Sequence, residues 1–325
     1  MGESALSAPP AVPVPMRSSH ATTVETSEVD ELVAAVRGLT VDYTRTSRGI
    51  GPCWAVSLAM DNVDITRGGM GFDASLTTQI PEDAYLFAVV HSAPQGTRWN
   101  DLPLTREQML MVPPSCAVVG TEPQGVDETL FVVRGDALDQ HAADLGIGLP
   151  KGTAPVVVRR HVGELVQAAD GLLGSRGAAD HSRGQAFVLD ALALAAQVGS
   201  PHGSVAKRRL SSSRIVRRCL ESLDGPDRWN PPVSRLCRVA MCSESRLRSA
   251  FVEVTGVPPT RYFQRRMLNE SRRRLADADP DEQTVASIAG ELGVIELGRF
   301  AGRYRHLFGE PPSATLGRRG RSRSR

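Results

Sequence analysis

Short apolar or alternating segments, separated by Gly, Pro, Asp and Asn, dominate residues 54–134. Side chains alternate between the two faces of a strand, so short segments of this kind bounded by turn residues are typical of β-strands. Their number and spacing predict a small antiparallel sandwich or barrel. The predicted strands lie at 54–60, 63–66, 85–91, 109–112, 117–119 and 130–133.

Helical periodicity flanks these strands. It predicts a short helix at 29–39, another at about 136–145 and a third at about 156–173. The segment 186–198 is apolar almost all round, and a helix of that kind must be buried. Burial within its own domain and burial against a second copy of the chain both satisfy this requirement, since symmetric dimers are common among soluble oligomers.

From residue 214 onward every pattern is helical, and one pattern occurs twice. Each copy consists of a short helix, a turn and a second helix, and it ends on a Gly-x-Pro-Pro sequence. These endings are Gly256 to Pro259 in the first copy and Gly309 to Pro312 in the second. Two tandem helix-turn-helix units would present two probes to the major groove of DNA. The repeat therefore predicts a DNA reader.

The first unit is predicted to pair a helix at 233–240 with a second helix from Ser243 to about Val254. The Ser243 hydroxyl is placed to cap that second helix. Opposite its apolar side, the helix carries small polar and basic side chains, and arginine can contact guanine through two hydrogen bonds. The DNA-binding residues predicted in this unit are Ser243, Ser245, Arg246, Arg248 and Ser249.

The second unit is predicted to pair a helix capped by Thr284 with a second helix at about 295–308. The outer face of the second helix carries charges three and four residues apart. It also carries Gly298 and Gly302, which would allow close approach to the DNA backbone. The DNA-binding residues predicted in this unit are Glu296, Gly298, Arg299 and Arg303.

A predicted helix at about 261–276 joins the two units. At roughly 16 residues it would be about 24 Å long, which suits two probes about 34 Å apart along the duplex. One side of it is apolar and the rest is rich in arginine, so we expect phosphate contacts, which set affinity but not sequence choice. For Arg272 in particular, we expect that replacement by alanine weakens binding to all DNA sequences alike.

The formal net charge of +2 conceals a division of the chain. Residues 205–325 carry 25 Lys and Arg against 13 Asp and Glu, a net charge of +12. Residues 1–204 carry 13 Lys and Arg against 23 Asp and Glu, a net charge of −10. An acidic half joined to a basic half fits one domain for sensing and one for a polyanion, and it permits the halves to dock electrostatically.

The C-terminal half resembles the AraC/XylS family of bacterial transcription regulators over about 214–316. The resemblance implies seven helices, double-stranded DNA read by the second helix of each unit, and RNA polymerase as a further partner. Three positions depart from the family pattern: Met241 stands where glycine is usual, Val294 where Phe is preferred and Gly298 where Ser is common. The positions that carry the likeness are Leu236-Cys237, Ser243, Leu247, Phe251, Gly256, Pro259, Tyr262, Arg266, Leu268-Asn269, Ile288-Ala289, Leu292-Gly293, Phe300, Tyr304, Phe308-Gly309 and Pro312.

Within that family, the segment Leu297 to Ala301 is similar to the branch that includes ethanolamine-utilisation regulators. The β-rich pattern of the N-terminal half, with its Met109 to Pro114 segment, is compatible with the same branch.

These patterns together predict an α+β chain. Its N-terminal part is a β-rich, cupin-like small barrel or sandwich with helices, and its C-terminal part is an all-α domain of two tandem helix-turn-helix units. The expected divisions are a disordered tail at 1–25, a sensor domain at 26–200, a linker at 201–213, the AraC-type double helix-turn-helix domain at 214–317 and a basic disordered tail at 318–325.

The main functional hypothesis is a sequence-specific transcription regulator, more specifically an activator, controlled by a small-molecule effector or partner bound to its N-terminal domain. The alternative is a cupin-type enzyme or metal-binding domain fused to a DNA-targeting domain. A third hypothesis is a ligand-independent regulator whose N-terminal domain only dimerises. The sequence lacks a phosphate loop, a nucleophile elbow and a His-Glu-x-x-His motif, and its seven histidines are scattered. These features favour a non-enzyme without metal or cofactor.

The five cysteines include no Cys-x-x-Cys pair, and four lie within apolar or helical patterns. Such thiols usually pack as small hydrophobic groups in a reducing compartment. No apolar run reaches the roughly 18 residues that a membrane helix needs. The N-terminus also lacks a basic segment followed by an apolar core. We therefore expect a cytoplasmic protein with no membrane partner.

Overall fold

The computed structural model describes residues 21–49, 51–106, 108–150, 155–158, 162–175, 178–197, 200–201, 211–223 and 228–318. The strands are β1 (Thr22–Thr26), β2 (Val41–Arg45), β3 (Cys53–Ala59), β4 (Val63–Gly69), β5 (Ala74–Gln79), β6 (Ala84–Ser92), β7 (Arg98–Trp99), β8 (Leu102–Pro103), β9 (Met109–Val112), β10 (Ala117–Glu122), β11 (Asp127–Arg134), β12 (Val156–Val158) and β13 (Ser200–Pro201). The helices are α1 (Val29–Ala35), α2 (Gly135–Asp144), α3 (Val162–Gly174), α4 (Ala178–Gln197), α5 (Ser212–Glu221), α6 (Val233–Ala240), α7 (Glu244–Thr255), α8 (Pro259–Asp277), α9 (Val285–Glu291), α10 (Leu297–Phe308) and α11 (Pro312–Thr315).

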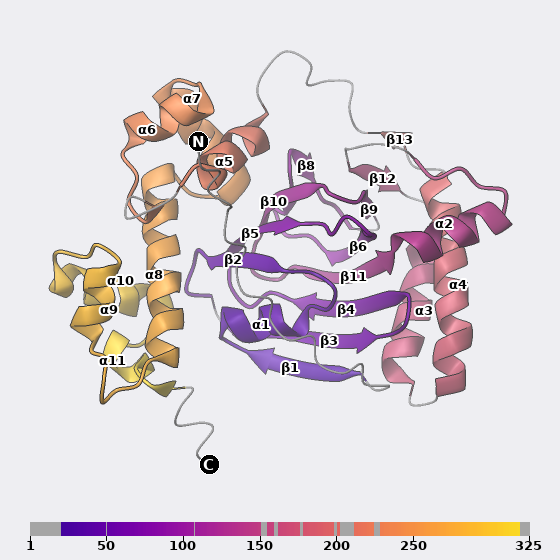
Figure 1. Cartoon of the computed structure of the whole chain (residues 1–325), viewed down its shortest axis with the longest axis horizontal. Coiled ribbons are helices and arrows are strands. Elements are labelled where there is room, and N and C mark those ends of the chain that lie inside the picture. Colours follow the sequence, from indigo (N-terminus) through magenta and orange to yellow (C-terminus); the bar gives the residue numbers. More distant parts are fainter. Residues whose placement is uncertain are drawn as a thin grey trace, which may run out of the picture.

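The strands form two antiparallel sheets in the N-terminal half (Figure 1). The larger sheet has the order β1-β3-β4-β11-β6-β9-β12-β13, and the smaller has the order β2-β5-β10-β7-β8. Alternation along the central strand β11 decides what each face packs against. Leu130 and Val132 enter the apolar core between the two sheets, whereas Phe131 and Val133 face the opposite side.

Helices α2, α3 and α4 cover that opposite side of the larger sheet (Figure 1). Their apolar stripes join Phe131, Val133 and neighbouring strand residues in a second core. Helix α4 is only partly buried there, because Phe187 keeps 51% and Leu194 keeps 39% of its surface exposed. These two side chains lie two turns apart, on one face of the helix.

The sequence-based description of this half needs several corrections. The two sheets do not close into one barrel, so the sandwich alternative fits the architecture, and the cupin-like character that we predicted is not confirmed. The predicted helix at 156–173 begins later, because 156–158 form strand β12 against β9. The predicted tail at 1–25 overlaps β1, which pairs with β3; residues 1–20 lie outside the described residues. Strands β2 and β5 were not predicted.

The described residues of the C-terminal half form seven α-helices, α5 to α11, as the family resemblance implies. Helices α5 to α7 and the start of α8 enclose one core, and the rest of α8 encloses a second with α9 and α10. In Figure 1, α8 stands between the two groups and faces the sheets. Of the predicted linker 201–213, Ser212 and Ser213 belong to α5, and residues 202–210 lie outside the described part of the chain.

None of the described helices combines the length and the apolar character needed to cross a membrane.

Candidate DNA-binding surface

The turn of the first helix-turn-helix unit is built by backbone hydrogen bonds at the end of α6. The amide of Met241 donates to the carbonyl of Arg238 (3.3 Å), and the amide of Cys242 donates to that of Cys237 (3.1 Å). This pair of bonds is a Schellman motif, which requires a left-handed residue. Met241 fills that position with φ of 52°, where the family pattern has glycine. The motif directs the chain into α7, whose N-terminus is capped when the Ser243 hydroxyl accepts a hydrogen bond from the amide of Arg246.

Most of the DNA-binding residues predicted on α7 lie together on an exposed surface. Ser243, Ser245, Arg248 and Ser249 are exposed, while the apolar side of the helix is buried against α5 and α6. Arg246 differs from them. It is half-buried, and its guanidinium donates a hydrogen bond to the Ser212 hydroxyl on α5 (3.1 Å). Arg246 therefore orients α7 against α5 in this structure.

The second unit has the same form. Thr284 caps α9 in a reciprocal arrangement with Ser287, which confirms the predicted start of that helix. Helix α10 begins at Leu297 instead of 295, so Glu296 is its N-cap residue. Gly256 after α7 and Gly309 after α10 both have positive φ (73° and 82°), which explains why each repeat ends on glycine.

The predicted residues of the second unit are exposed at the start and middle of α10. Arg299 forms an ion pair with Glu296 (3.0 Å) that is open to solvent, so little free energy holds the arginine in place. Arg303 lies beside the side-chain amide of Gln264 on α8. A Cβ atom added at Gly298 or Gly302 would meet no atom within 4 Å, so packing within the described chain does not require glycine there.

Comparisons with known proteins bear on this half of the chain. The family description of a helix-turn-helix domain matches residues 236–318. The XylDLEGF operon transcriptional activator 1 of Pseudomonas putida is 36% identical over 109 residues, which are 34% of this chain and 32% of that protein. The probable thc operon regulatory protein of Rhodococcus erythropolis is 31% identical over 102 residues, 31% of each chain. The C-terminal region is an AraC-type helix-turn-helix domain.

The chain matches only about a third of the length of these relatives. Among solved structures, the AraC-like transcriptional activator CuxR is similar over 84% of this chain and 100% of its own, with a TM-score of 0.41 and 15% identity. The comparisons give no support to the more specific likeness to ethanolamine-utilisation regulators.

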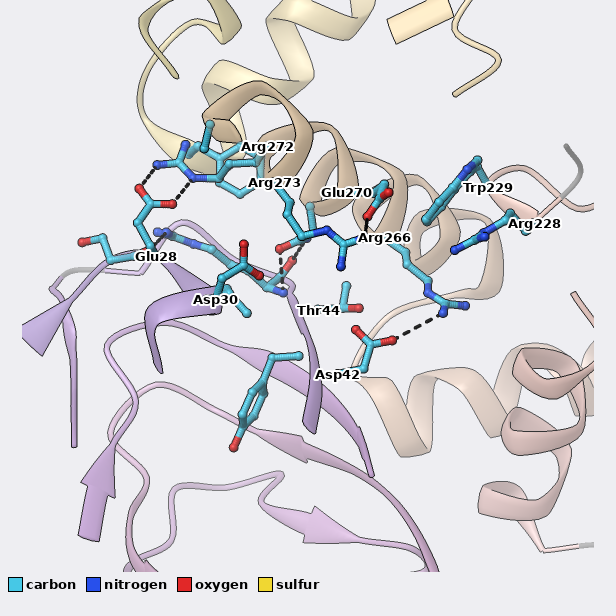
Figure 2. Close-up of a pocket in the computed structure, with 17 residues that line it drawn as sticks. Glu28, Asp30, Asp42, Thr44, Arg228, Trp229, Arg266, Glu270, Arg272 and Arg273 are labelled. Carbon is cyan, nitrogen blue, oxygen red and sulfur yellow. Dashed lines mark hydrogen bonds and ion pairs between the residues drawn. The ribbon is translucent and has the colours of Figure 1, made fainter. Parts of the chain in front are cut away.

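Several arginines of α8 are engaged within the chain instead of being left free for the phosphate contacts that we predicted. Figure 2 shows several of them directed at the N-terminal half or at acidic neighbours. Nη2 of Arg266 lies 3.4 Å from Oδ2 of Asp42 on β2. Nε of Arg274 lies 2.7 Å from Oε1 of Glu270 on the same helix. The side chain of Arg272 is only 10% exposed, so the prediction that it binds phosphate does not hold in this conformation.

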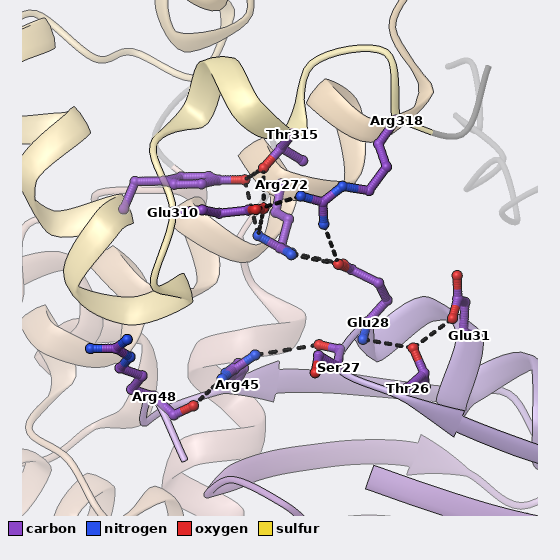
Figure 3. A network of polar contacts seen from close by, with 11 residues as sticks. Thr26, Ser27, Glu28, Glu31, Arg45, Arg48, Arg272, Glu310, Thr315 and Arg318 are labelled. Carbon is purple, nitrogen blue, oxygen red and sulfur yellow. Dashed lines mark hydrogen bonds and ion pairs between the residues drawn. The ribbon is translucent and has the colours of Figure 1, made fainter. Parts of the chain in front are cut away.

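Arg272 instead joins the AraC-type domain to the first residues of the sandwich (Figure 3). Its Nε donates to Glu28, which precedes α1 (2.7 Å), and its Nη1 donates to Glu310, which precedes α11 (2.9 Å). Arg318 also contacts both carboxylates. Burial raises the pKa of Glu28, but the hydrogen bond and charge of Arg272 outweigh this and leave that pKa below its ordinary value. We name Glu28, Arg272, Glu310 and Arg318 the interdomain ion cluster.

Arg318 was predicted to open a disordered basic tail, and the structure corrects this for the one residue of that tail it describes. Residues 319–325 lie outside the described part of the chain.

A cleft of about 150 Å³ lies beside the ion cluster, between α8 and the start of the sandwich (Figure 2). Its walls include Asp42 and Arg45 from β2, and Trp229 and Asn269 from the AraC-type domain. The Asn269 amide donates to the backbone carbonyl of Arg45 (3.0 Å) and accepts from its amide (3.2 Å), so α8 is bonded directly to β2.

The first unit is also attached to the sandwich, through β10. Val119 belongs to the same apolar core as α5, α6 and α7. Thr121 donates a hydrogen bond to the carbonyl of Val254 near the end of α7. These contacts bury the C-terminal end of α7 and leave its N-terminal half, with Ser245 and Arg248, exposed. Sequence reasoning allowed for docking of the halves by charge but missed these particular contacts, because no periodicity or motif marks Glu28 or Thr121, and Asn269 was noted only as part of the family likeness.

Metal-ligating side chains are not grouped in the described part of the chain, where no three His, Cys, Asp or Glu residues are placed to hold one ion. His91, which ends a predicted strand, is hydrogen-bonded through Nε2 to the Thr129 hydroxyl (2.8 Å).

Proposed function

We propose that the chain is a sequence-specific regulator of transcription that binds double-stranded DNA through α7 and α10 and acts as an activator. One observation carries the proposal: both helix-turn-helix units hold the N-terminal half of their second helix exposed, within a domain matched to operon activators. Activation, and RNA polymerase as a partner, rest on the likeness to those activators.

The proposed base-reading residues are the exposed polar side chains of the two helices. Arg248 would read bases from α7, assisted by Ser245 and Ser249, and Arg299 would read them from α10. The Ser243 hydroxyl and the surface around Gly298 would approach phosphates, since helix N-termini favour anions. In the free protein Glu296 forms an exposed ion pair with Arg299. If Arg299 turned to contact a guanine, Glu296 would be free to accept a hydrogen bond from a cytosine. Arg303 belongs to the same exposed surface of α10. Arg246 would act indirectly, by stabilising the position of α7 through its hydrogen bond to Ser212 on α5.

Replacing Arg248 or Arg299 with alanine tests these roles. Each change should relax base preference within one half-site and cost about 1–3 kcal/mol on the preferred sequence, while binding to unrelated DNA changes little. The measurement is the affinity of each variant for a panel of singly substituted sites. Arg305→Ala is the matched control, because Arg305 is an exposed arginine on a different face of α10. An equal loss on every sequence for Arg248→Ala and Arg299→Ala would contradict the assignment.

We further propose that the N-terminal sandwich controls DNA binding in response to a small molecule or partner. The contacts of β10 with α7, of β2 with α8, and of Glu28 with Arg272 support this, since they connect the sandwich to both units. The acidic charge of one half and the basic charge of the other also favour docking. Arg272→Ala should therefore alter DNA affinity and preserve the sequence preference, and identical affinity would argue against control through these contacts.

A homodimer through α4 is the remaining partner that we propose. Phe187 and Leu194 are exposed large apolar side chains on one face of this partly buried helix. Sedimentation measures this directly, with a particle of twice the 34.9 kDa chain expected. A monomer at the micromolar concentrations used for DNA binding would rule it out.

A further inference from the structure

Two carboxyl groups lie inside the sandwich, each supplied by a different sheet. Glu122 ends β10 of the smaller sheet, and its alternation with Val118 directs it inward. Glu128 lies near the start of β11 in the larger sheet and alternates inward with Leu130. Glu122 is 1% exposed and Glu128 is 6% exposed. Neither faces an arginine or lysine through an ion pair in the described residues, although buried acidic side chains normally have such a partner.

The hydrogen bonds of the two groups differ. Glu122 accepts from the indole Nε1 of Trp99 (3.2 Å) and from the hydroxyl of Tyr43. Within the described part of the chain, Oε2 of Glu128 is buried without a hydrogen-bond partner. Leaving a buried polar atom unpaired is costly, and such atoms in native proteins often mark a place for a ligand or ion.

A small cavity of about 30 Å³ lies between these carboxyls and the apolar wall of the sandwich. Its polar lining includes Glu122, Glu128, Tyr43 and Thr66, and Leu32, Met70 and Val126 are among its apolar lining. Since one water-sized group needs about 10–15 Å³ of such space, the cavity holds roughly two groups. A fitting occupant therefore has a hydrogen-bond donor at one end and a short hydrocarbon at the other.

We propose that this cavity binds a small primary ammonium ligand of about one or two carbons, whose nitrogen donates to Oε2 of Glu128 and to Glu122. An ammonium group supplies three donors and a positive charge, which is what two buried carboxyls lack. Burial raises the pKa of Glu128 well above its ordinary value, with further increases from the charges of Glu122 and Asp127. Burial raises the pKa of Glu122 to about 7. Without a ligand, Glu122 and Glu128 retain their protons. When the ammonium ligand binds, its positive charge would replace these protons in neutralising the two carboxylates.

The walls of the cavity are the strands that touch the AraC-type domain. Glu122 follows Thr121, whose hydroxyl donates a hydrogen bond to the carbonyl of Val254 near the end of α7. Tyr43 lies on β2, between Asp42 and Arg45, and both of these residues contact α8. A ligand that shifts β10 or β2 would thus change contacts with both helices. Its role as an effector rests on the proposed function, whereas its occupancy of the cavity does not.

The test uses the full-length protein and ethylammonium chloride as probe. Very small ligands reach at most about 1.5 kcal/mol per non-hydrogen atom, so the expected dissociation constant is of the order of millimolar. The melting temperature is measured up to about 0.1 M probe against sodium chloride at the same ionic strength, where a bound ligand stabilises by mass action. Sodium acetate, of similar size and opposite charge, is the ligand control. We expect the ammonium salt alone to raise the melting temperature.

Two variants make the result specific. Glu128→Gln keeps the size and removes the charge, and it should weaken probe binding at least about tenfold. Asp127→Asn removes a charge from the adjacent residue, whose side chain is paired with Arg67 on the other face of the sheet. It leaves both carboxyls of the cavity in place and removes a contribution to the raised pKa of Glu128 that is smaller than that of burial, so it should still bind the probe, far more nearly like the wild type than Glu128→Gln does. No effect of the probe on the wild type, or an equal effect on Glu128→Gln, overturns the proposal. Selection of bound DNA with the same preparations tells a failure of the ammonium site from a failure of the proposed function. Specific DNA binding without ammonium binding contradicts only the ammonium site. Ammonium binding without specific DNA binding contradicts only the proposed function.

Discussion

Replacing Arg272 with alanine should lower the free energy of unfolding by about 3 kcal/mol, because it leaves Glu28 and Glu310 partly buried without their central cation. The guanidinium also lies over the ring of Phe308 (4.7 Å to the ring centre), and that contact is lost as well. Arg318 remains beside both carboxylates and offsets part of the loss. Chemical denaturation of the full-length protein near neutral pH measures the effect.

Arg273→Ala is the matched control for this substitution. Arg273 is the next residue of α8, but its side chain is 53% exposed and pairs with Glu270, which keeps Arg274 as a second partner. Its removal should cost less than about 0.5 kcal/mol. Both Glu28 and Glu310 have lowered pKa values in the folded state. The difference in stability between wild type and Arg272→Ala should therefore be full above the ordinary glutamate pKa and should shrink as the pH falls through the lowered folded-state values and these carboxylates become protonated. Equal stabilities of the Arg272 and Arg273 variants would show that the interdomain ion cluster does not hold the halves together.

Glu128→Gln should have little effect near pH 4.5 and should stabilise the protein increasingly as the pH rises, by about 1.4 kcal/mol for each pH unit over which folded Glu128 keeps a proton that the unfolded chain has lost. The folded state keeps Glu128 and Glu122 protonated to a higher pH than the unfolded chain does, because burial raises both pKa values. Between the unfolded pKa near 4.5 and the folded value of about 7 for Glu122, the folded state therefore binds more protons, and stability falls as the pH rises. Glutamine has no proton to lose, so the variant should lose less stability over this range.

Denaturation at a series of pH values, without added amine, measures this effect. The other titratable groups that influence Glu122 and Glu128 are Tyr43 on β2, Cys53 on β3 and Asp127 on β11. Burial raises the pKa values of Tyr43 and Cys53, so both side chains stay neutral between about pH 4.5 and 8. Asp127→Asn removes a charge that contributes less than burial does to the raised pKa of Glu128, so its profile should lie close to that of the wild type and well apart from that of Glu128→Gln. Parallel profiles for wild type and Glu128→Gln would mean that Glu128 is not the group whose ionisation opposes folding.

The helical half of the chain could be predicted from sequence because its signals are local. Caps at Ser243 and Thr284, glycine at the end of each second helix and a 3.6-residue apolar period fix the helix ends to within a few residues. Strands β2 and β5 were missed because threonine and other polar residues interrupt their apolar alternation, and pairing with each other and with β10 makes them strands.

Properties that depend on long-range contacts could not be predicted. Arg272 looks like any solvated arginine in the sequence, and only its position opposite Glu28, 244 residues away, buries it. Glu122 and Glu128 end up in one cavity because two sheets face each other, a relation that no local pattern encodes. The proposed DNA-binding residues could be placed on exposed helix faces from the sequence, since they lie on helices whose buried face is periodic; Arg246 is half-buried instead and bonds to Ser212.

The central claim is that α7 and α10 together read DNA sequence. Selection of bound DNA from a random library by the full-length protein, repeated at two salt concentrations, tests it most directly. We expect enrichment of two short blocks about one helical turn apart, roughly 34 Å along the duplex, with the same blocks at both salt concentrations. Salt-sensitive binding without any enriched sequence would contradict the claim, because it would reduce the basic half to a non-specific attachment to phosphates.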